Sequence, residues 1–239
     1  MSYETFAYYY DSLMEPQFYE DYYEFILKHA CFDSVLELGC GTGEIAIRLA
    51  KNDKTVYATD LSSDMLEVTK QKAIEENINL MLQCTDMSCF STSYQFDLVL
   101  CLCDSINYLL EEQQILSTFM NAFKSLKSQG TFIFDIDSLH KMNVILKDYH
   151  EYEEDDDFIF RWNVELIDDG FVHHYVYIED RIENEIVEEN HYQKTYEVNQ
   201  YCQWLYESGF RDVQIFSDFQ DYKEECERII FVCRKGEDV

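Results

Sequence analysis

The sequence predicts an α/β protein with a mostly parallel sheet of seven strands and helices on both faces of that sheet. Three observations predict this fold. Short apolar runs alternate with stretches of helical periodicity along most of the 239 residues, as in strands joined by crossover helices. A turn with three glycines follows the first apolar run. A block of alternating polar and apolar residues then interrupts the pattern between residues 140 and 196.

The elements follow from the sequence in order. The chain begins with an aromatic-rich segment, residues 6–27, which we interpret as one or two helices broken near Pro16. Helices are also predicted directly after the glycine turn, after a cap at Ser62, and over about 111–127 and 197–207. The apolar runs that predict strands are residues 35–38, 55–60, 78–84, 96–102, 131–136, 213–216 and 229–233.

The interrupting block predicts a separate unit. Polar and apolar residues alternate over 158–167, 171–178 and 186–196, and Asp168-Asp169-Gly170 is a hairpin signal. We therefore predict an antiparallel β insertion, residues 140–196, after the fifth strand. Residues 1–139 and 197–239 would then form one domain. The insertion could be a lid over a ligand site, or a ribbon that holds a homodimer together.

Charge limits the partners of the protein. The chain has 18 Lys and Arg against 48 Asp and Glu, a formal net charge of −30. Nucleic acids are bound largely by Lys and Arg that neutralise phosphates, so DNA and RNA are poor candidates. Solubility explains the acidity more simply than recruitment of cationic substrates does.

Cysteine usage and hydropathy indicate the compartment. The nine cysteines include no Cys-x-x-Cys pair, which favours buried thiols in a reducing cytoplasm over disulfides or a metal site. No apolar stretch approaches the roughly 18 residues of a membrane span, and the first residues do not resemble a secretory signal. We expect a cytoplasmic protein without a metal or a membrane partner.

The glycine turn is the most informative motif. In Glu37-x-Gly39-Cys40-Gly41-x-Gly43-Glu44 the third glycine comes one residue too early for a dinucleotide-binding G-x-G-x-x-G turn. Glu37 and Glu44 would also repel a diphosphate. A cationic ligand without phosphate suits an acidic glycine turn better.

This E-x-G-x-G-x-G pattern resembles motif I of the class I S-adenosylmethionine-dependent methyltransferases, whose cofactor carries a sulfonium and an ammonium group. Asp60 to Leu66 is similar to the D-x-S-x-x-M-L signature of that family. The segments Y-D-x-L-M, starting at Tyr10, and C-D-S-x-N-Y-L, starting at Cys103, resemble a branch of small bacterial methyltransferases. The resemblance implies a Rossmann-like sheet and S-adenosyl-L-methionine as cofactor.

Physical arguments accompany several of these positions. Asp60 ends a strand at the ligand-binding edge, where its carboxylate can accept both ribose hydroxyls, although it could instead cap the next helix. The resemblance implies that Asp86 accepts from the adenine amino group while the N–H of Met87 donates to the ring. The full set of expected cofactor-binding residues is Tyr10, Glu37, Gly39, Cys40, Gly41, Gly43, Asp60, Leu61, Met65, Asp86, Met87 and Cys101.

The acceptor of the methyl group is less well indicated. The loop after the fourth strand lacks the proline of enzymes that methylate base amines or glutamine amides. Asp104 could orient or deprotonate an acceptor, or cap the loop, and no catalytic residue is assigned. The substrate-site candidates are Asp104, Asn107, Tyr108 and His173.

Taken with the charge, these motifs predict methyl transfer to an N or O atom of a small molecule. Two alternatives remain open at this stage. The protein could methylate a basic protein segment, or it could bind the cofactor without transferring its methyl group.

Overall fold

A computed structural model describes residues 6–7, 9–11, 14 and 16–237. Residues Ser12 and Leu13 of the Y-D-x-L-M segment therefore lie outside the described residues. Within the described part, residues 6–7 and 9–11 are helical, and helix α2 (Pro16–His29) starts at its proline, where a missing backbone N–H costs nothing. No helix in this part of the chain is long and apolar enough to cross a membrane.

The predicted α/β class is confirmed, with one large, mostly parallel sheet. Its strand order is β11-β10-β12-β5-β4-β1-β2-β3. The strands β1 (Ser34–Leu38), β2 (Thr55–Asp60), β3 (Met81–Cys84), β4 (Phe96–Cys101) and β5 (Leu126–Asp137) are parallel to one another. The antiparallel strands are β10 (Asp212–Ser217), β11 (Gln220–Asp221) and β12 (Arg228–Arg234).

Three details of the sheet differ from the sequence prediction. Strand β5 starts at Leu126 and not at residue 131, so the preceding helix ends at Ser125 and not near residue 127. The sheet has eight strands instead of seven, because the two-residue β11 turns back onto β10. Strand β3 starts at Met81 and not at residue 78. The N–H of Ile78 bonds to the carbonyl of Ala73 at 2.8 Å, so Ile78 is held by the turn that ends the preceding helix.

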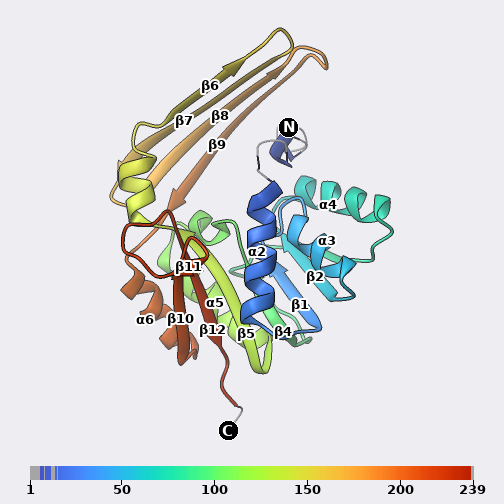
Figure 1. The fold of residues 1–239 in the computed structure, drawn as a ribbon, viewed down its shortest axis with the longest axis vertical. Helices are drawn as coiled ribbons and strands as arrows, with labels where there is room; N and C mark the ends of the chain where they lie inside the picture. Colours follow the sequence, from blue (N-terminus) through green and yellow to red (C-terminus); the bar gives the residue numbers. More distant parts are fainter. Residues whose placement is uncertain (1–5, 8, 12–13, 15, 238–239) are drawn as a thin grey trace.

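Helices cover both faces of the sheet because side chains alternate along each strand. On one face, Leu36, Val99 and Phe132 pack with helices α5 (Glu112–Ser125) and α6 (Val198–Ser208). On the other, Val35 and Leu98 pack with α2, α3 (Glu44–Lys51) and α4 (Ser63–Glu75). Figure 1 shows these layers around the central strands.

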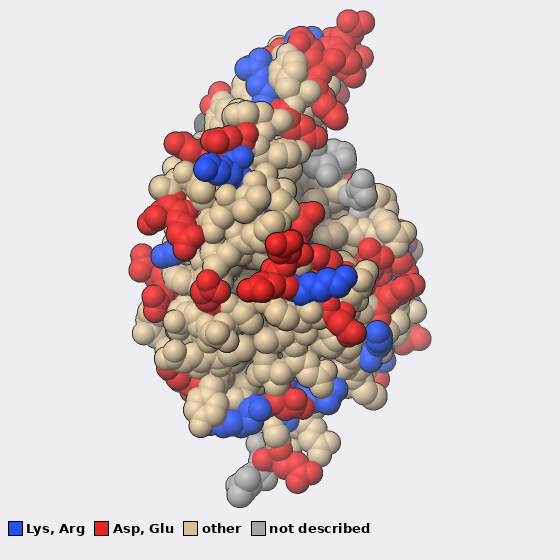
Figure 2. Space-filling model, turned by 60° about the vertical axis from the view of Figure 1, so that its left-hand side comes forward, with Lys and Arg blue, Asp and Glu red and all other residues tan. Residues whose placement is uncertain are grey.

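A second sheet stands above the carboxyl edge of the first (Figure 1). It consists of the antiparallel strands β6 (His150–Glu154), β7 (Phe158–Asp168), β8 (Phe171–Asp180) and β9 (Glu185–Lys194), in that order. The one-turn π-helix η2 (Lys141–Ile145) precedes it. We call residues 150–194 the upper sheet. Figure 2 shows Asp and Glu side chains gathered at its tip.

The inner face of the upper sheet is apolar. Phe160, Val176 and Ile178 pack against Phe6 and Met65, and nearer the base Val164 and Val172 pack against η2. The described residues 6–7 and 9–11, which we call the N-terminal segment, therefore lie between the upper sheet and the main sheet. The hydroxyl of Tyr9 donates to Asp180 at 2.8 Å, which ties this segment to the upper sheet.

Candidate functional site

The main cleft lies where the strand order reverses, between β1 and β4. In open α/β sheets this reversal opens a crevice at the carboxyl ends of the strands. The cavity has a volume of about 720 Å³, within the range of cofactor and ligand sites. It is lined by the ends of β1, β2, β3 and β4, by the N-terminal segment, and by β9 of the upper sheet.

The glycine turn forms the floor of the cleft and requires glycine for two reasons. Gly39 and Gly41 have φ of 71° and 53°, in the left-handed region. A Cβ on Gly39 would lie 2.8 Å from the Oγ of Ser105. A Cβ on Gly41 would meet no atom within 4 Å, so the backbone there faces open space that a ligand can occupy.

Gly43 has a packing role instead. It is the N-cap of α3, and a Cβ there would lie 2.5 Å from the Cγ2 of Thr69 on α4. The residue is absent from the cleft lining. The third glycine thus lets α3 and α4 approach each other, and the expectation that Gly43 contacts the cofactor receives no support from its position.

Glu37 is a buried acid at the end of β1, with 3% of its surface exposed. Burial, together with the charge of Asp60, raises its pKa to about 8. Its Oε2 has no hydrogen-bond partner among the described residues. Buried polar atoms are nearly always paired, so this oxygen is suited to a hydrogen-bond donor or cation brought by a ligand.

Asp60 connects the glycine turn to the end of β2. Its Oδ2 accepts the N–H of Gly41 and its Oδ1 accepts the N–H of Ser62, both at 2.8 Å. The N-cap of α4 is Ser62, whose Oγ accepts the N–H of Met65. Burial raises the pKa of Asp60, and the backbone hydrogen bonds partly offset that rise. The carboxylate is therefore oriented at the cleft without being the helix cap itself.

Asp86 and Met87 line the cleft beyond β3. The Oδ1 of Asp86 accepts the N–H of Ser88 at 2.7 Å, and Asn121 of α5 donates to the carbonyl of Met87. These contacts fix the turn that presents both residues. Leu61, 72% exposed, and Met65 lie on the β2 side of the same space.

The loop after β4 has an unusual backbone. Cys103 and Asp104 both adopt positive φ, 56° and 51°, which is costly for residues with a side chain and is often found at functional sites. The N–H of Asp104 donates to Asp135 on β5 at 2.9 Å. Its Oδ1 accepts from Arg228 at 3.1 Å, while Oδ2 accepts from Gln193 at 2.7 Å.

Asp104 is ionised in this setting. Burial opposes ionisation, but the guanidinium of Arg228 lowers the pKa of Asp104 below its ordinary value. Arg228 also pairs with Asp135 and lies 3.6 Å from Asp137. A carboxylate with a lowered pKa and two strong donors is a poor proton acceptor, which argues against Asp104 as a base.

Aromatic side chains close the cleft from above. The rings of Phe6 and His191 are 5.6 Å apart, and those of Tyr108 and His191 are 5.9 Å apart at 90°. Phe6 is also 6.0 Å from Tyr10. These four residues come from the N-terminal segment, η1 (Ser105–Tyr108) and β9.

Three further residues expected at the site lie elsewhere. Cys101 is fully buried under the floor with its Sγ 3.8 Å from the Sδ of Met87, and the lining comes from the next residues of the loop. Asn107 is buried, where it donates to the carbonyl of Lys194 and accepts the N–H of Asp137. His173 points to the outer face of the upper sheet, bonds Asn190 and stacks on Tyr192.

His191, Phe6 and Tyr19 also line the cleft, although the sequence did not indicate them. His191 shares the inner face of β9 with Val187, Glu189 and Gln193. Only Val187 in that set is apolar, so the alternation could not identify the inner face. Tyr19 is one of several aromatic residues of α2. Only its position near the start of the helix separates it from the aromatic residues that do not line the cleft.

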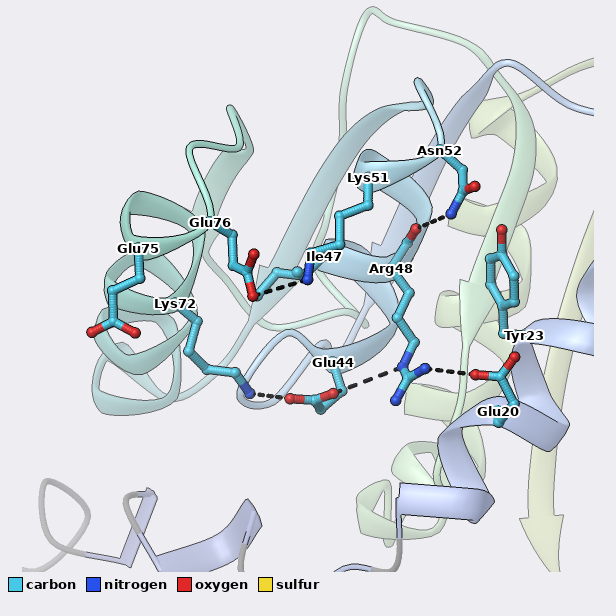
Figure 3. A pocket seen from close by; sticks show the side chains of 10 residues that line it. All are labelled: Glu20, Tyr23, Glu44, Ile47, Arg48, Lys51, Asn52, Lys72, Glu75 and Glu76. Carbon is cyan, nitrogen blue, oxygen red and sulfur yellow. Dashed lines mark hydrogen bonds and ion pairs between the residues drawn. The ribbon is translucent and has the colours of Figure 1, made fainter.

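A second groove of about 570 Å³ lies between α2, α3 and α4. Figure 3 shows that its charged side chains face one another, with Glu44 placed between Lys72 and Arg48. Arg48 also pairs with Glu20, and Lys51 with Glu76. Lys72 bonds Asp11 of the N-terminal segment at 2.8 Å. These pairs hold the N-terminal segment against the helices beside the cleft.

The fold and the cleft define a class of protein. A reversed parallel sheet with a glycine turn after β1 and an acid at the end of β2 binds a nucleoside-containing cofactor. The unpartnered Oε2 of Glu37 and the open backbone of Gly41 fit a cationic cofactor without phosphates. The chemistry of the residues therefore agrees with S-adenosylmethionine.

Comparison with known proteins agrees with this class. Residues 35–130 match the family model described as a methyltransferase domain. A protein of Geobacillus sp. (strain WCH70), provisionally named a methyltransferase, is 35% identical over 98% of this chain and 100% of its own length. YqeM of Bacillus subtilis (strain 168), also provisionally named a methyltransferase, is 31% identical over 100% of this chain and 99% of its own.

A solved structure extends the likeness to three dimensions. The crystal structure of an S-adenosylmethionine-dependent methyltransferase from Clostridium acetobutylicum ATCC 824 superposes with a TM-score of 0.88 at 26% identity, covering 98% of this chain and 99% of that one. The chain belongs to the S-adenosylmethionine-dependent methyltransferases, and its cofactor is S-adenosylmethionine.

Proposed function

We propose that this methyltransferase acts on an N or O atom of a small molecule. The observation that carries the proposal is the enclosure of the cleft, because Phe6 of the N-terminal segment and His191 of β9 meet above it. A folded protein or a nucleic acid would need an open groove at this point. A small acceptor can instead be enclosed with the cofactor.

The charges of the cleft support a neutral or cationic acceptor. None of the described residues that line it is Lys or Arg, so an acceptor bearing phosphate or several carboxylates would lack a counter-charge. The acids that line the cleft are Glu37, Glu44, Asp60, Asp64, Asp86 and Asp104.

We propose the following cofactor contacts, which the family resemblance implies for residues that line the cleft. Asp60 accepts the ribose hydroxyls, Asp86 accepts from the adenine amino group, and the N–H of Met87 donates to the ring. Leu61 and Met65 pack on the nucleoside. Glu37 and the backbone of Gly39, Cys40 and Gly41 meet the cationic part, and Tyr10 forms a wall beside it.

Bound S-adenosylmethionine supplies a methyl group that is already activated by its sulfonium. The protein then contributes mainly alignment and the exclusion of water. In this proposal residues 140–196 are the lid of the active site, and not a dimerisation ribbon. The contact of Phe160, Val176 and Ile178 with Phe6 supports that role, since it attaches the insertion to the segment that closes the cleft.

Two measurements test the proposal. The purified protein is incubated with S-adenosylmethionine and one of two acceptor panels. The first panel contains small amines, alcohols and phenols, and the second contains basic peptides and proteins. Release of S-adenosylhomocysteine is measured in both. We expect release with members of the small-molecule panel only. Transfer to basic peptides alone would make it a protein methyltransferase. Tight cofactor binding in calorimetry, with no S-adenosylhomocysteine formed in the presence of any acceptor, would indicate a protein that only binds the cofactor.

The lid is tested by replacing residues 141–194 with a short glycine-serine linker. Cofactor affinity should stay within about tenfold, since the glycine turn, Asp60 and Asp86 are retained, whereas transfer should be abolished. Loss of a dimer with activity retained would assign the insertion to assembly instead.

A further inference from the structure

The cleft has two chemically different halves. The acids of its lining, apart from Asp104 on the loop between the halves, lie at or after the carboxyl ends of β1, β2 and β3 on the cofactor side. The opposite half is lined by the N-terminal segment, by η1 and the residues after it, and by β9. Among its described lining residues none is Asp, Glu, Lys or Arg. We call Phe6, Tyr10, Tyr108 and His191 the acceptor wall. This wall suits a flat, uncharged acceptor.

His191 is the group of this wall that can take a proton near neutral pH. Its Nε2 is buried and has no hydrogen-bond partner among the described residues. Burial, with a smaller contribution from His173, lowers the pKa of His191 below its ordinary value. The imidazole is therefore neutral at pH 7 and has an unused acceptor or donor nitrogen.

The titratable groups around His191 leave it in that state. Across the strand pair it faces His174 on β8, whose pKa burial lowers to about 4. Glu189 and Gln193 are its neighbours on the inner face of β9, and the phenol of Tyr108 is its neighbour from η1. The side-chain amide of Gln193 donates a hydrogen bond to Asp104. None of these provides a fixed positive charge.

Asp104 does not compete for the proton. Both of its oxygens already accept hydrogen bonds, from Arg228 and from Gln193, and Arg228 balances its charge. Among the described lining residues of this half, an alkylammonium acceptor would find no other carboxylate, since Glu189 of β9 is buried and does not line the cleft. A ring hydroxyl needs a proton acceptor and no counter-ion, which is what the acceptor wall offers.

We propose that the acceptor is a hydroxyl on an aromatic or enolic ring and that His191 is the catalytic residue that accepts its proton. The inference rests on the proposed small-molecule function. As the O–H bond breaks, the proton moves to His191 and leaves an imidazolium. The oxygen lone pair forms the O–CH3 bond while the S–CH3 bond breaks and its electron pair stays on sulfur. The products are a methyl ether, S-adenosylhomocysteine and one proton, which His191 returns to solvent.

The test uses a chromophoric phenol and does not need the natural acceptor. The whole protein is saturated with S-adenosylhomocysteine and titrated with 4-nitrophenol just below the pKa of the free phenol, while the phenolate absorbance is recorded. We expect a saturable excess of phenolate, because a phenolate beside His191 favours the imidazolium and offsets the lowered pKa of the free imidazole. His191→Gln should remove the excess. His150→Gln is the matched control, since the exposed His150 of β6 bonds Asn163 and does not line the cleft, and it should leave the excess unchanged.

A kinetic measurement follows on any ring hydroxyl of the acceptor panel that supports transfer. His191→Gln should lower the rate by about 100-fold or more and remove the acid limb of its pH profile. The proposal is overturned if the wild type gives no excess phenolate or if His191→Gln keeps it. Transfer only to amines would overturn it as well. Failure of the proposed function gives a different result, because no S-adenosylhomocysteine is then formed with any acceptor of the panels.

Discussion

Gln193 of the upper sheet donates a hydrogen bond to the Oδ2 of Asp104, the loop residue that faces the cleft, at 2.7 Å. Two neighbouring contacts also hold the end of β9 against the main sheet. Asn107 donates to the carbonyl of Lys194, and Thr195 donates to the carbonyl of Asp137. The position of β9 and the shape of the loop after β4 are therefore set together, so closure of the upper sheet and the geometry of the acceptor half depend on each other.

Replacing Gln193 with Ala should weaken this connection. Asp104 loses one donor in a mostly buried place, at a cost of about 1–2 kcal/mol. We expect the KM for the acceptor to rise roughly tenfold, with cofactor affinity within about twofold, measured by steady-state kinetics and calorimetry. Gln203→Ala, which removes an exposed Gln–Glu207 contact on α6, is the control. Equal losses of cofactor and acceptor binding would contradict the coupling.

Asp60→Ala should weaken cofactor binding by about 1–3 kcal/mol, because two ribose hydroxyls lose their acceptor in a partly buried site. Asp86→Ala should cost less, since an amino group at the edge of the cleft can bond water. Calorimetry with S-adenosylhomocysteine measures both. Ser62→Ala removes the cap of α4 and leaves the carboxylate, so it controls for helix stability. Wild-type affinity in a folded Asp60→Ala protein would leave Asp60 only the role of fixing the turn.

Glu37 predicts a pH dependence. Its pKa is raised from 4.5 to about 8 by burial and by Asp60, so the folded protein holds a proton that the unfolded chain releases. The free energy of unfolding should then fall as the pH rises from about 4.5 to 8. Glu37→Gln should flatten that fall and make the cofactor-free protein more stable at pH 8, while it weakens binding of the cationic cofactor.

Urea denaturation at several pH values measures the first effect, and calorimetry measures the second. The expected stabilisation is a few kcal/mol at most, since the buried carboxyl can recruit water in the free protein. A Glu37→Gln protein that is destabilised at pH 8, or that binds S-adenosylmethionine as the wild type does, would refute this role of the residue.

Much of the fold followed from the sequence because the parallel strands are continuous apolar runs bounded by glycine, Asp or Ser. Residues 98–101 of β4 show this, since they are apolar and fully buried and both faces of the strand are covered. β11 was missed because two exposed residues have no pattern of their own. β6 was missed because its sequence, His-Glu-Tyr-Glu-Glu, is mostly exposed and carries almost no apolar signal.

The floor of the cleft was more predictable than its roof. Gly39, Gly41, Asp60 and Asp86 lie within short motifs whose spacing fixes their place. The roof depends on which face of β9 turns inward, and one residue of slip exchanges the two faces. The same uncertainty holds for β8, where His173 was expected at the site but lies on the outer face, whereas the structure brings His191 there from β9.

The net charge of −30 predicts that the protein does not bind nucleic acids near physiological salt. The lining of the cleft, with no Lys or Arg among its described residues, gives the same expectation locally. A gel-shift or anisotropy titration with tRNA and duplex DNA should show no complex at micromolar protein. A saturable complex that survives 150 mM salt would contradict the prediction and weaken the case for a small acceptor.

Arg228 should be the most important charged residue for stability. It is 7% exposed and contacts Asp104, Asp135 and Asp137. Removing one partner of a buried ion pair leaves uncompensated charge, so Arg228→Met should lower the free energy of unfolding by about 3–5 kcal/mol. Arg234→Met is the matched control on the same strand. Its pair with Asp212 is exposed, at 3.7 Å, and its loss should cost less than about 1 kcal/mol.

A second substitution separates charge from packing at the same place. Burial raises the pKa of Asp135, and the guanidinium of Arg228 opposes that rise. In Arg228→Met the guanidinium is lost, whereas the burial remains. Adding Asp135→Asn removes the stranded charge, so the double variant should recover a substantial part of the loss. Urea denaturation of the four proteins of the cycle gives the coupling energy. Additive losses would mean that Arg228 stabilises the fold through its stacking on Phe18 and Tyr22, and not through the carboxylates.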